Sequence, residues 1–486
     1  MGGSVMDAIA LAGLSGGTRH IARGTFEVFR NGLKGNAIFP TDEAFAESTL
    51  IWNGMIQRRP SVVIRPESVQ DVVRTVEFAR ESGIELSIKG GGHNIAGLAL
   101  SDGGITLDMG GMRSVHVDVA ERVAKVGPGC TLGDVDRVTQ EHGLAATFGF
   151  VSATGVAGLT LGGGFGYLTR QFGWTVDDLE EVEIVLASGE VVRASRHVHQ
   201  DLFWALRGGG GNFGVVSEFV FKLHEIGPEV TAGLIAWSAD EAPAVLDLFH
   251  KVNSTASRQL TIAALMRNAP QAPWLPEDKH GKPMIALVIN HTGTEAKATA
   301  DLAPIRSWGQ PWADLVQKKP YVAQQSMLDA TQPKGMGYYW KSEFIPGLSQ
   351  EFLDTYRAQF IDLKAPANQI FLFHIEGALR EYAEDDGAVG NRDAAYAYVC
   401  QSMFPADNPA AADSNKQWVR SAWQALRPFS TGGNYINFQT DDEEGERIAE
   451  AYRDNFDRLA RVKAEYDPLN LFRVNRNILP TTSAQV

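Results

Sequence analysis

Cysteine is nearly absent from this sequence, and its scarcity excludes several classes of protein. The 486 residues include two cysteines, Cys130 and Cys400. They can form one bridge at most, so a disulfide-rich scaffold is excluded. No Cys and His spacing typical of a zinc site occurs, and the pair His197 and His199 has no third ligand near it in the sequence. We therefore predict no metal, and a surface loop around these two histidines.

Long apolar runs and an excess of basic residues are missing as well. No stretch of about 18 apolar residues occurs, so no transmembrane helix is predicted. The N-terminus lacks the basic start and sustained apolar core of a signal peptide, from which we expect a cytoplasmic protein. The formal net charge of −14 argues against nucleic acid or an anionic membrane as a partner. The acidic run at 441–446 predicts a solvated surface turn.

Glycine, in contrast, is abundant, with 50 residues. The hydrophobic fraction of 44% and the charged fraction of 21% are those of an ordinary globular protein with a large interior. The chain length suggests roughly three units of about 150 residues. Glycines concentrate in 149–222, where bare backbone could press against a ligand.

Regular secondary structure is predicted along most of the chain. Residues 61–66 and 84–89 predict strands, and apolar residues at helical spacing predict a helix over 67–82. Residues 1–50 predict only short helices. After residue 225, strand-like stretches alternate with aromatic-rich loops, which indicates a second domain built on a sheet.

Two glycine-flanked residues have side chains that can carry chemistry. The stretch "IKGGGHNIAGLAL" at 88–100 places His93 after three glycines, and "GPGC" places Cys130 at the predicted start of a helix. The histidine could bind a metal, move protons or form a bond to the ligand. A thiol beside a helix N-terminus has a lowered pKa and is a better nucleophile. The alternatives are a capping histidine and an inert buried thiol, and the residue types alone do not choose.

A dinucleotide-binding fold of the Rossmann type is not favoured. The motif "GGGFG" at 162–166 does not open a strand-turn-helix unit, and no acidic residue follows a second strand to hold a ribose. Several separate glycine loops instead indicate one large ligand that is held by several backbone segments.

Taken together, the motifs resemble the berberine bridge enzyme-like family, which belongs to the vanillyl-alcohol oxidase (PCMH-type) flavoproteins. In the family's order they are "GGGHNIAGLALSDGGITLDM", "VGPGCTLGDVD", "GVAGLTLGGGFGYLTRQFG", "RGGGGNFGVV" and "DPLNLFRVNRNI". The resemblance implies an α+β protein of two domains. An FAD-binding domain of two α+β subdomains is expected at 1–225, and a substrate domain with an antiparallel sheet backed by helices at 226–440. A C-terminal segment at 441–486 is expected to return to the FAD domain.

The same resemblance implies FAD attached by two bonds, from His93 to the flavin 8α-methyl carbon and from Cys130 to flavin C6. Cys400 is then structural. Glycine loops, two valines on the adenine side and polar residues near both ends of the chain are implied to line the cofactor. These residues are Gly90, Gly91, Gly92, Asn94, Gly97, Gly129, Gly133, Gly155, Gly158, Gly162, Gly163, Gly164, Val215, Val216, Asn475 and Asn477.

Candidate catalytic residues also rest on the resemblance. Tyr435 in "TGGNYINFQ" resembles an active-site tyrosine, and Tyr382 in "HIEGALREYAED" takes the place of a second catalytic side chain. For an alcohol, a base takes the hydroxyl proton as hydride moves to flavin N5. A tyrosine has a pKa of about 10, so Tyr435 needs a cation or a strong hydrogen-bond donor beside it. Substrate contacts are implied at Tyr338, Tyr339, Lys341 and Glu376.

The implied activity is that of a bicovalent FAD oxidase. Its small-molecule substrate is a hydroxyl-bearing carbohydrate or secondary metabolite, and O₂ takes the electrons and becomes H₂O₂. The alternatives are a dehydrogenase with another acceptor, a nicotine-type amine oxidase, and a flavin-binding protein without turnover. The identity of the substrate does not follow, because such enzymes share flavin motifs and differ in their pocket walls.

Overall fold

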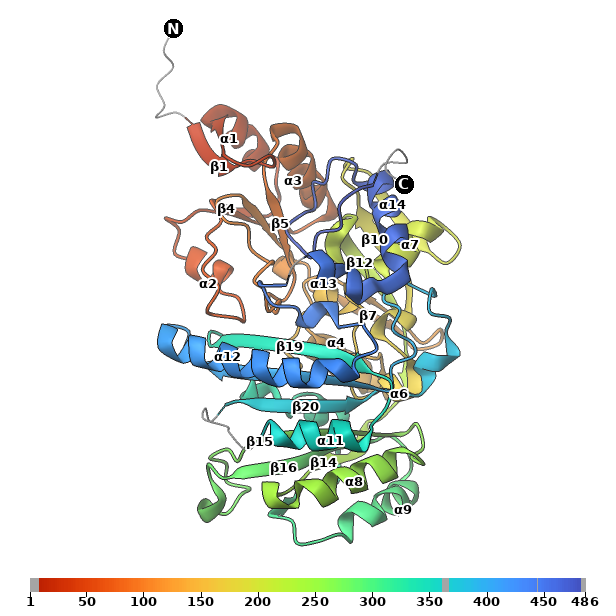
Figure 1. The fold of residues 1–486 in the computed structure, drawn as a ribbon. Coiled ribbons are helices and arrows are strands. Elements are labelled where there is room, and N and C mark those ends of the chain that lie inside the picture. The colour runs from red at the N-terminus through yellow and green to blue at the C-terminus, as the bar shows by residue number, and fades with distance from the viewer. Residues whose placement is uncertain (1–7, 361–366, 444, 482–486) are drawn as a thin grey trace.

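The computed structural model describes residues 8–360, 367–443 and 445–481. These residues form a four-stranded, a five-stranded and an eight-stranded sheet, with two small two-stranded sheets beside them (Figure 1). The first small sheet is a hairpin of β1 (Ala8–Ala12) and β2 (Thr18–Ala22), which precedes α1 (Arg23–Asn31). The prediction of short helices alone in this region was therefore incomplete.

The four-stranded sheet has the order β3-β4-β6-β5. A helix, α3 (Val69–Ser82), connects β4 to β5; both strands run parallel to β6. The Ser68 side chain accepts a hydrogen bond from the backbone N–H of Asp71 at its start, and Gly83 ends it in the left-handed conformation. These predicted elements are confirmed. The strands are β3 (Asn36–Ile38), β4 (Val62–Arg65), β5 (Leu86–Lys89) and β6 (Ile105–Asp108), and α2 (Phe45–Thr49) lies before β4.

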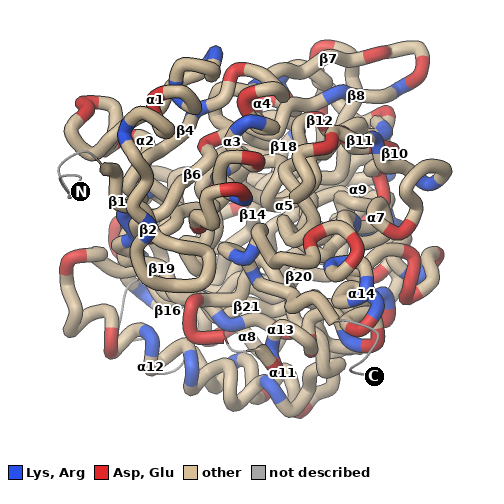
Figure 2. The backbone as a smooth tube through the Cα atoms, turned by 90° about the horizontal axis from the view of Figure 1, so that it is seen from above, with Lys and Arg blue, Asp and Glu red and all other residues tan. Residues whose placement is uncertain are grey.

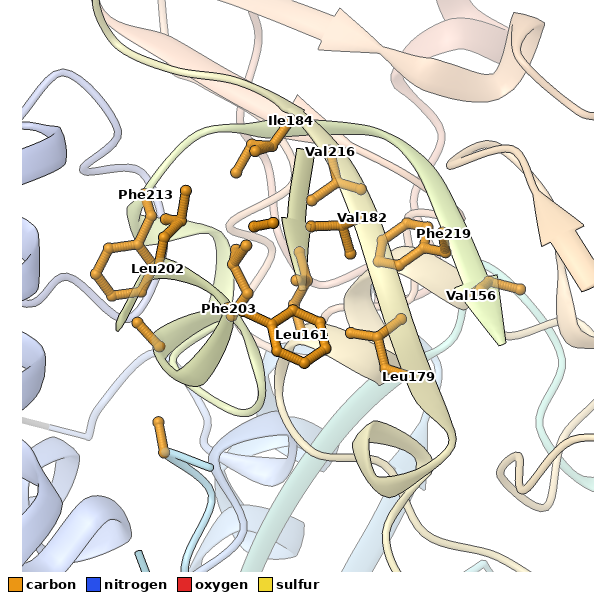
Figure 3. Packing of buried hydrophobic residues seen from close by; sticks show 14 of the residues in the cluster. Val156, Leu161, Leu179, Val182, Ile184, Leu202, Phe203, Phe213, Val216 and Phe219 are labelled. Carbon is orange, nitrogen blue, oxygen red and sulfur yellow. The ribbon is translucent and has the colours of Figure 1, made fainter. Parts of the chain in front are cut away.

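The five-stranded sheet has the order β11-β10-β12-β8-β7. Valine and isoleucine alternate with glutamate along β10, so one face of the strand is apolar. That face packs with α5 and α7 in a buried core, as Figure 3 shows for Val182, Phe203 and Phe219. The elements are β7 (Val115–Asp118), β8 (Val123–Val126), α4 (Leu132–Thr139), α5 (Val156–Leu161), β10 (Leu179–Val185), β11 (Val191–Ser195), α7 (Gln200–Leu206) and β12 (Val215–Lys222).

The eight-stranded sheet is antiparallel throughout, in the order β17-β14-β16-β15-β20-β21-β19 with β18 beside β14. Helices cover one of its faces, and its other face has a separate apolar core (Figure 1). The strands are β14 (Glu229–Ser238), β15 (Leu260–Asn268), β16 (Pro283–His291), β17 (Ala313–Asp314), β18 (Gln317–Pro320), β19 (Gly337–Ile345), β20 (Gln369–His374) and β21 (Tyr396–Phe404). The helices are α8 (Ala242–Asn253), α9 (Glu295–Arg306), α11 (Gln350–Ala358) and α12 (Pro409–Leu426). The predicted α+β class and the sheet backed by helices are confirmed.

The C-terminal part of the chain lies against the N-terminal half. The helix α14 (Phe456–Tyr466) packs on α7, and both contribute to the same core (Figure 1). Before it come α13 (Gly445–Tyr452) and the 3₁₀ helix η11 (Ile436–Phe438). The remaining short elements are β9 (Leu144–Ala145), α6 (Thr169–Phe172), β13 (His224–Glu225) and α10 (Tyr321–Gln325). The domain limits at 225 and 440 stay a prediction.

Charged residues of both signs are interspersed along the backbone (Figure 2). The predicted solvated turn at 441–446 is wrong in one respect, because Glu443 is buried and its carboxylate lies 2.6 Å from the Lys341 ammonium. Glu444 lies outside the described residues. His197 and His199 are exposed, as predicted for a surface loop. No helix in the described ranges is both long enough and apolar enough to cross a membrane.

Candidate functional site

A large cavity lies between the eight-stranded sheet and the glycine-rich loops of the N-terminal half. Its volume is about 1740 Å³, with its open, solvent-filled part included. The loop after β5, the segment around α5 and the stretch that contains η11 bring distant parts of the sequence together here. Contributing segments are 90–95, 149–151, 157–159, 210–212, 435–438 and 474–476.

Bare backbone forms one wall of the cavity. The loops that contain Gly91 and Gly155 touch each other so closely that a Cβ on Gly91 would lie 2.6 Å from the Cα of Gly155. A Cβ on Gly158, in contrast, would meet no atom within 4 Å. The first two glycines therefore allow the loops to pack, whereas Gly158 leaves room on the cavity side of α5.

His93 lines the cavity and has a buried nitrogen without a partner. Its Nε2 makes no hydrogen bond with any described residue. Its ring stacks on Trp52 at a centroid distance of 4.4 Å, and Trp52 in turn stacks on Tyr338 at 3.7 Å. Burial lowers the pKa of His93 to about 4, so the imidazole is neutral at neutral pH. A neutral, positioned imidazole can act as a nucleophile.

Cys130 does not share this environment. Its side chain is fully buried in the core beside the five-stranded sheet, its Sγ donates to the carbonyl of Ser114 at 3.4 Å, and it does not line the cavity. Burial and the nearby Asp134 carboxylate raise the pKa of the thiol to about 11. These two effects outweigh the neighbouring N-terminus of α4. The prediction of a lowered pKa was wrong, whereas the bond from Cys130 to the cofactor stays a prediction.

The other predicted cofactor residues divide into two groups. Those that line the cavity are Gly90, Gly91, Gly92, Asn94, Gly155, Gly158, Gly162 and Asn475. Those that do not are Gly97, Gly129, Gly133, Gly163, Gly164, Val215, Val216 and Asn477. Packing explains several of the second group, since a Cβ on Gly97 would clash with Ile56. Val215 and Val216 belong to cores on opposite faces of β12.

Tyr435 lines the cavity between Phe165 and Phe438, with ring centroids 4.9 and 4.8 Å away. The Asn437 amide donates to its hydroxyl at 2.9 Å, and no cation contacts it among the described residues. Burial raises the pKa of Tyr435 well above its ordinary value. The phenol is therefore protonated at neutral pH, so it can donate a hydrogen bond but cannot serve as a phenolate base.

Tyr382 and Glu376 lie away from the cavity, because β20 ends at His374 and the chain then leaves the sheet. The Tyr382 ring packs under the Arg392 guanidinium, 4.7 Å from its centroid, and burial raises its pKa to about 12. Glu376 is 40% exposed and pairs with Arg380 at 3.1 Å. The predicted pair of Tyr435 and Tyr382 is not formed, and neither Tyr382 nor Glu376 is placed to touch a substrate.

Side chains of β19 alternate between the two faces of the sheet. Trp340 lines the cavity and Tyr338 a smaller adjoining pocket, whereas Tyr339 and Lys341 point toward α12. There the Tyr339 hydroxyl donates to Asp442 at 2.6 Å, and Lys341 pairs with Asp442 and Glu443. Tyr339 and Lys341 were therefore wrongly predicted as substrate contacts.

Several cavity residues were missed. Phe371 and Phe373 of β20 both face the cavity, and the alternation in "QIFLFH" could have identified them. Gln401 of β21 also lines it, but its facing depends on the register with β19 and β20, which no local pattern shows.

The chain is similar to known FAD-linked proteins. Residues 60–195 match the FAD binding domain model, and 434–479 match the model described as berberine and berberine like. An FAD-linked oxidoreductase of Dictyostelium discoideum is 31% identical over 88% of this chain and 91% of its own length. The (R)-6-hydroxynicotine oxidase of Paenarthrobacter nicotinovorans is 31% identical over 93% of this chain and 98% of its own length. A crystal structure of 6-hydroxy-D-nicotine oxidase from Arthrobacter nicotinovorans is 28% identical, covers 93% of this chain and 99% of its own, and superimposes with a TM-score of 0.79. A xylooligosaccharide oxidase from Thermothelomyces thermophilus is 28% identical over 88% of this chain and 89% of its own length.

Proposed function

Because the chain belongs to the berberine bridge enzyme-like FAD-linked oxidoreductases, we propose that it is an oxidase that carries FAD on His93 and oxidises a hydroxyl-bearing small molecule. The observation that carries the cofactor assignment is the unpartnered, buried Nε2 of His93 at the wall of a glycine-lined cavity. Bare backbone around Gly91 and Gly155 fits a flat or phosphate-bearing ligand. When bound, FAD accepts a hydride from the substrate and passes the electrons to O₂, which becomes H₂O₂.

A single covalent bond to the flavin is the form that these residues support. His93 is neutral and has a free nitrogen at the cavity, whereas Cys130 has a raised pKa and a thiol directed at Ser114. We therefore propose attachment through His93, and the second bond, from Cys130 to the flavin, stays a prediction.

The substrate is expected to lie between the apolar sheet face and Tyr435. Phe371, Phe373 and Trp340 give this part of the cavity an apolar wall. The Tyr435 hydroxyl, which accepts a hydrogen bond from Asn437, would hold the substrate hydroxyl. The proton that leaves an alcohol substrate would pass to water at the open side of the cavity.

Amine oxidation is a second candidate, which one observation favours. Tyr435 has no cationic partner among the described residues and stays protonated. An alcohol needs a base for its hydroxyl proton, but a neutral amine can lose a hydride without one. The (R)-6-hydroxynicotine oxidase among the relatives is consistent with such chemistry.

The attachment is tested by acid precipitation of the purified protein. We expect a yellow pellet from the wild type and from Cys130→Ala, but a colourless pellet and a yellow supernatant, or no flavin, from His93→Ala. A yellow pellet from His93→Ala would restore the second bond, because Cys130 would then hold the flavin by itself.

The activity is tested by anaerobic bleaching of the flavin absorbance with oligosaccharides, aromatic alcohols and nicotine-like amines, followed by air. Bleaching by one class identifies the substrate. Fast return of colour supports an oxidase, whereas a flavin that stays reduced in air indicates a dehydrogenase. A bound flavin that no class bleaches contradicts the proposed catalysis and favours a flavin-binding protein.

A further inference from the structure

A smaller pocket opens beside the main cavity and shares part of its wall. Gln332, Trp340 and Gln401 line both hollows, and Arg267 and Gln369 line the smaller one. The space that it leaves for the centres of water-sized molecules is about 10 Å³, room for roughly one such group. Only the end group of a ligand in the main cavity can therefore reach into the smaller pocket.

The polar residues of this pocket form one row across the sheet. Arg267 on β15 is the register partner of Gln369 on β20, Gln369 that of Gln401 on β21, and Gln401 that of Trp340 on β19. Strands lie about 4.8 Å apart, so the row extends roughly 14 Å from Trp340 to Arg267. The apolar residue two positions before Arg267, Leu265, faces the same core as Phe371.

Arg267 has a charge that no described residue neutralises. Its Nε donates to the carbonyl of Asn268 at 3.1 Å, and no carboxylate of a described residue lies within 4.0 Å. Burial lowers its pKa, and no acidic group of a described residue contributes an opposing effect. The arginine of the main cavity, Arg476, instead donates to the carbonyls of Gln439 and Thr440.

A partly buried guanidinium without a partner is costly unless a ligand supplies the negative charge. We propose that the substrate carries a carboxylate, which Arg267 binds at one end of the row while the oxidised group lies beside Tyr435. The planar guanidinium fork matches the two oxygens of a carboxylate. The side-chain amide of Gln401 is a further donor along the row. Gln369 donates a hydrogen bond to the Gln401 amide oxygen at 2.7 Å, which leaves the NH₂ group of Gln401 available to the ligand.

One cation in this pocket favours a single negative charge over a phosphate. The length of the row favours an extended acid over one small ring. This inference rests on the proposed function for the oxidised group, but the binding of the carboxylate does not depend on turnover.

The test is isothermal titration calorimetry of the flavin-loaded protein with biphenyl-4-carboxylate and with its neutral isostere, biphenyl-4-carboxamide. We expect the acid to bind at least about tenfold more tightly than the amide, since a charge-assisted hydrogen bond contributes that much. Arg267→Gln should abolish this preference, because it should weaken binding of the acid far more than binding of the amide. Arg306→Gln, which removes a surface arginine paired with Asp314 at 2.9 Å, is the matched control and should keep it.

Equal binding of acid and amide, absence of acid binding, or a preference that survives in Arg267→Gln would overturn the proposal. If Arg267→Gln does not fold, Arg267→Lys keeps the charge, removes the fork, and should weaken binding of the acid only; unchanged binding overturns the proposal equally. Flavin absorbance of the same sample reports on the proposed function separately. Protein without flavin contradicts that function, whereas equal binding by flavin-loaded protein contradicts only the role of Arg267.

Discussion

Tyr435 illustrates how burial decides the chemistry of a single residue. Phe165 and Phe438 surround its ring, and the only hydrogen bond to its hydroxyl from another side chain comes from a neutral amide, Asn437, within the described residues. The same physical cause acts oppositely on a histidine, because burial disfavours whichever form is charged. It keeps Tyr435 protonated and His93 neutral.

The substitution Tyr435→Phe should lower the rate constant of flavin reduction by about 10²-fold, the typical effect of removing one positioned donor. The flavin should stay attached. Because the pKa of Tyr435 is raised well above its ordinary value, the wild-type rate should show no inflection from this residue between about pH 6 and 9. Stopped-flow absorbance measures both effects. Tyr382→Phe is the matched control outside the cavity, and an equal loss in both variants would remove the special role of Tyr435.

Gly158→Ala should separate protein stability from cofactor binding. Alanine in α5 should stabilise the flavin-free protein by up to about 1 kcal/mol, because no atom lies within 4 Å of its Cβ. The same methyl group should reduce flavin incorporation if the flavin packs on this wall. Gly155→Ala should lower the melting temperature, because its Cβ would clash with Gly91. Full flavin incorporation in Gly158→Ala would show that the flavin does not pack against α5.

At the scale of elements, buried ion pairs join segments that are distant in sequence. The 3₁₀ helix η4 (Thr175–Asp177) ends in a carboxylate that binds the Arg392 guanidinium through two hydrogen bonds of 2.6 and 2.7 Å. The Asp177 side chain is 0% exposed and the Arg392 side chain 3%. This pair ties the loop before β21 to the segment between α6 and β10.

Arg392→Met should lower the free energy of unfolding by about 3–5 kcal/mol, because it leaves Asp177 as a buried, uncompensated charge. Arg193→Met is the matched control. Arg193 is 46% exposed among three glutamates, so its loss should cost less than about 1 kcal/mol. Urea denaturation followed by circular dichroism measures both values. Equal costs would show that the buried pair contributes no more than a surface one.

Local sequence patterns predicted individual helices and strands well, but predicted less well which face of a sheet each side chain lies on. Helical spacing with Ser68 and Gly83 at its ends correctly placed α3, and apolar runs placed β4 and β5. The hairpin of β1 and β2 was missed because "TRHIA" is largely exposed and carries no apolar alternation. The facing of Lys341 was wrong because its partners, Asp442 and Glu443, lie about a hundred residues away.

At the scale of the whole molecule, Asp136 is buried where α4 meets α10. Gln325 donates to its Oδ2 at 3.1 Å, and its Oδ1 has no partner among the described residues. Burial raises its pKa to about 7. A carboxyl whose pKa is higher in the folded than in the unfolded state binds its proton more tightly when folded. Its contribution to stability is therefore full below about pH 4 and is lost as the pH rises to about 7.

Asp136→Asn should remove this pH dependence. The stability of the variant relative to the wild type should rise between about pH 4 and pH 8. The gain should be a few kcal/mol at most, because each pH unit between the unfolded-state and the folded-state pKa of Asp136 contributes about 1.4 kcal/mol. Melting temperatures at about pH 5 and pH 8 provide the measurement, and Asp247→Asn on the exposed face of α8 is the control. A stability difference between variant and wild type that is equal at both pH values would show that Asp136 does not titrate in this range.

The sequence by itself determined the family, through motifs that occur in the family's order, and the resemblance implied the α+β class that the structure has. The role of His93 stays a prediction. Only the tertiary structure decided which of the motif residues meet. Cys130 also follows a glycine, yet its thiol faces a core and its pKa is raised. Arg267 belongs to no motif, and only the register of four strands places it in a row with Gln401. The reason is physical: burial, register and charge compensation depend on contacts between segments far apart in the chain, which no local pattern contains.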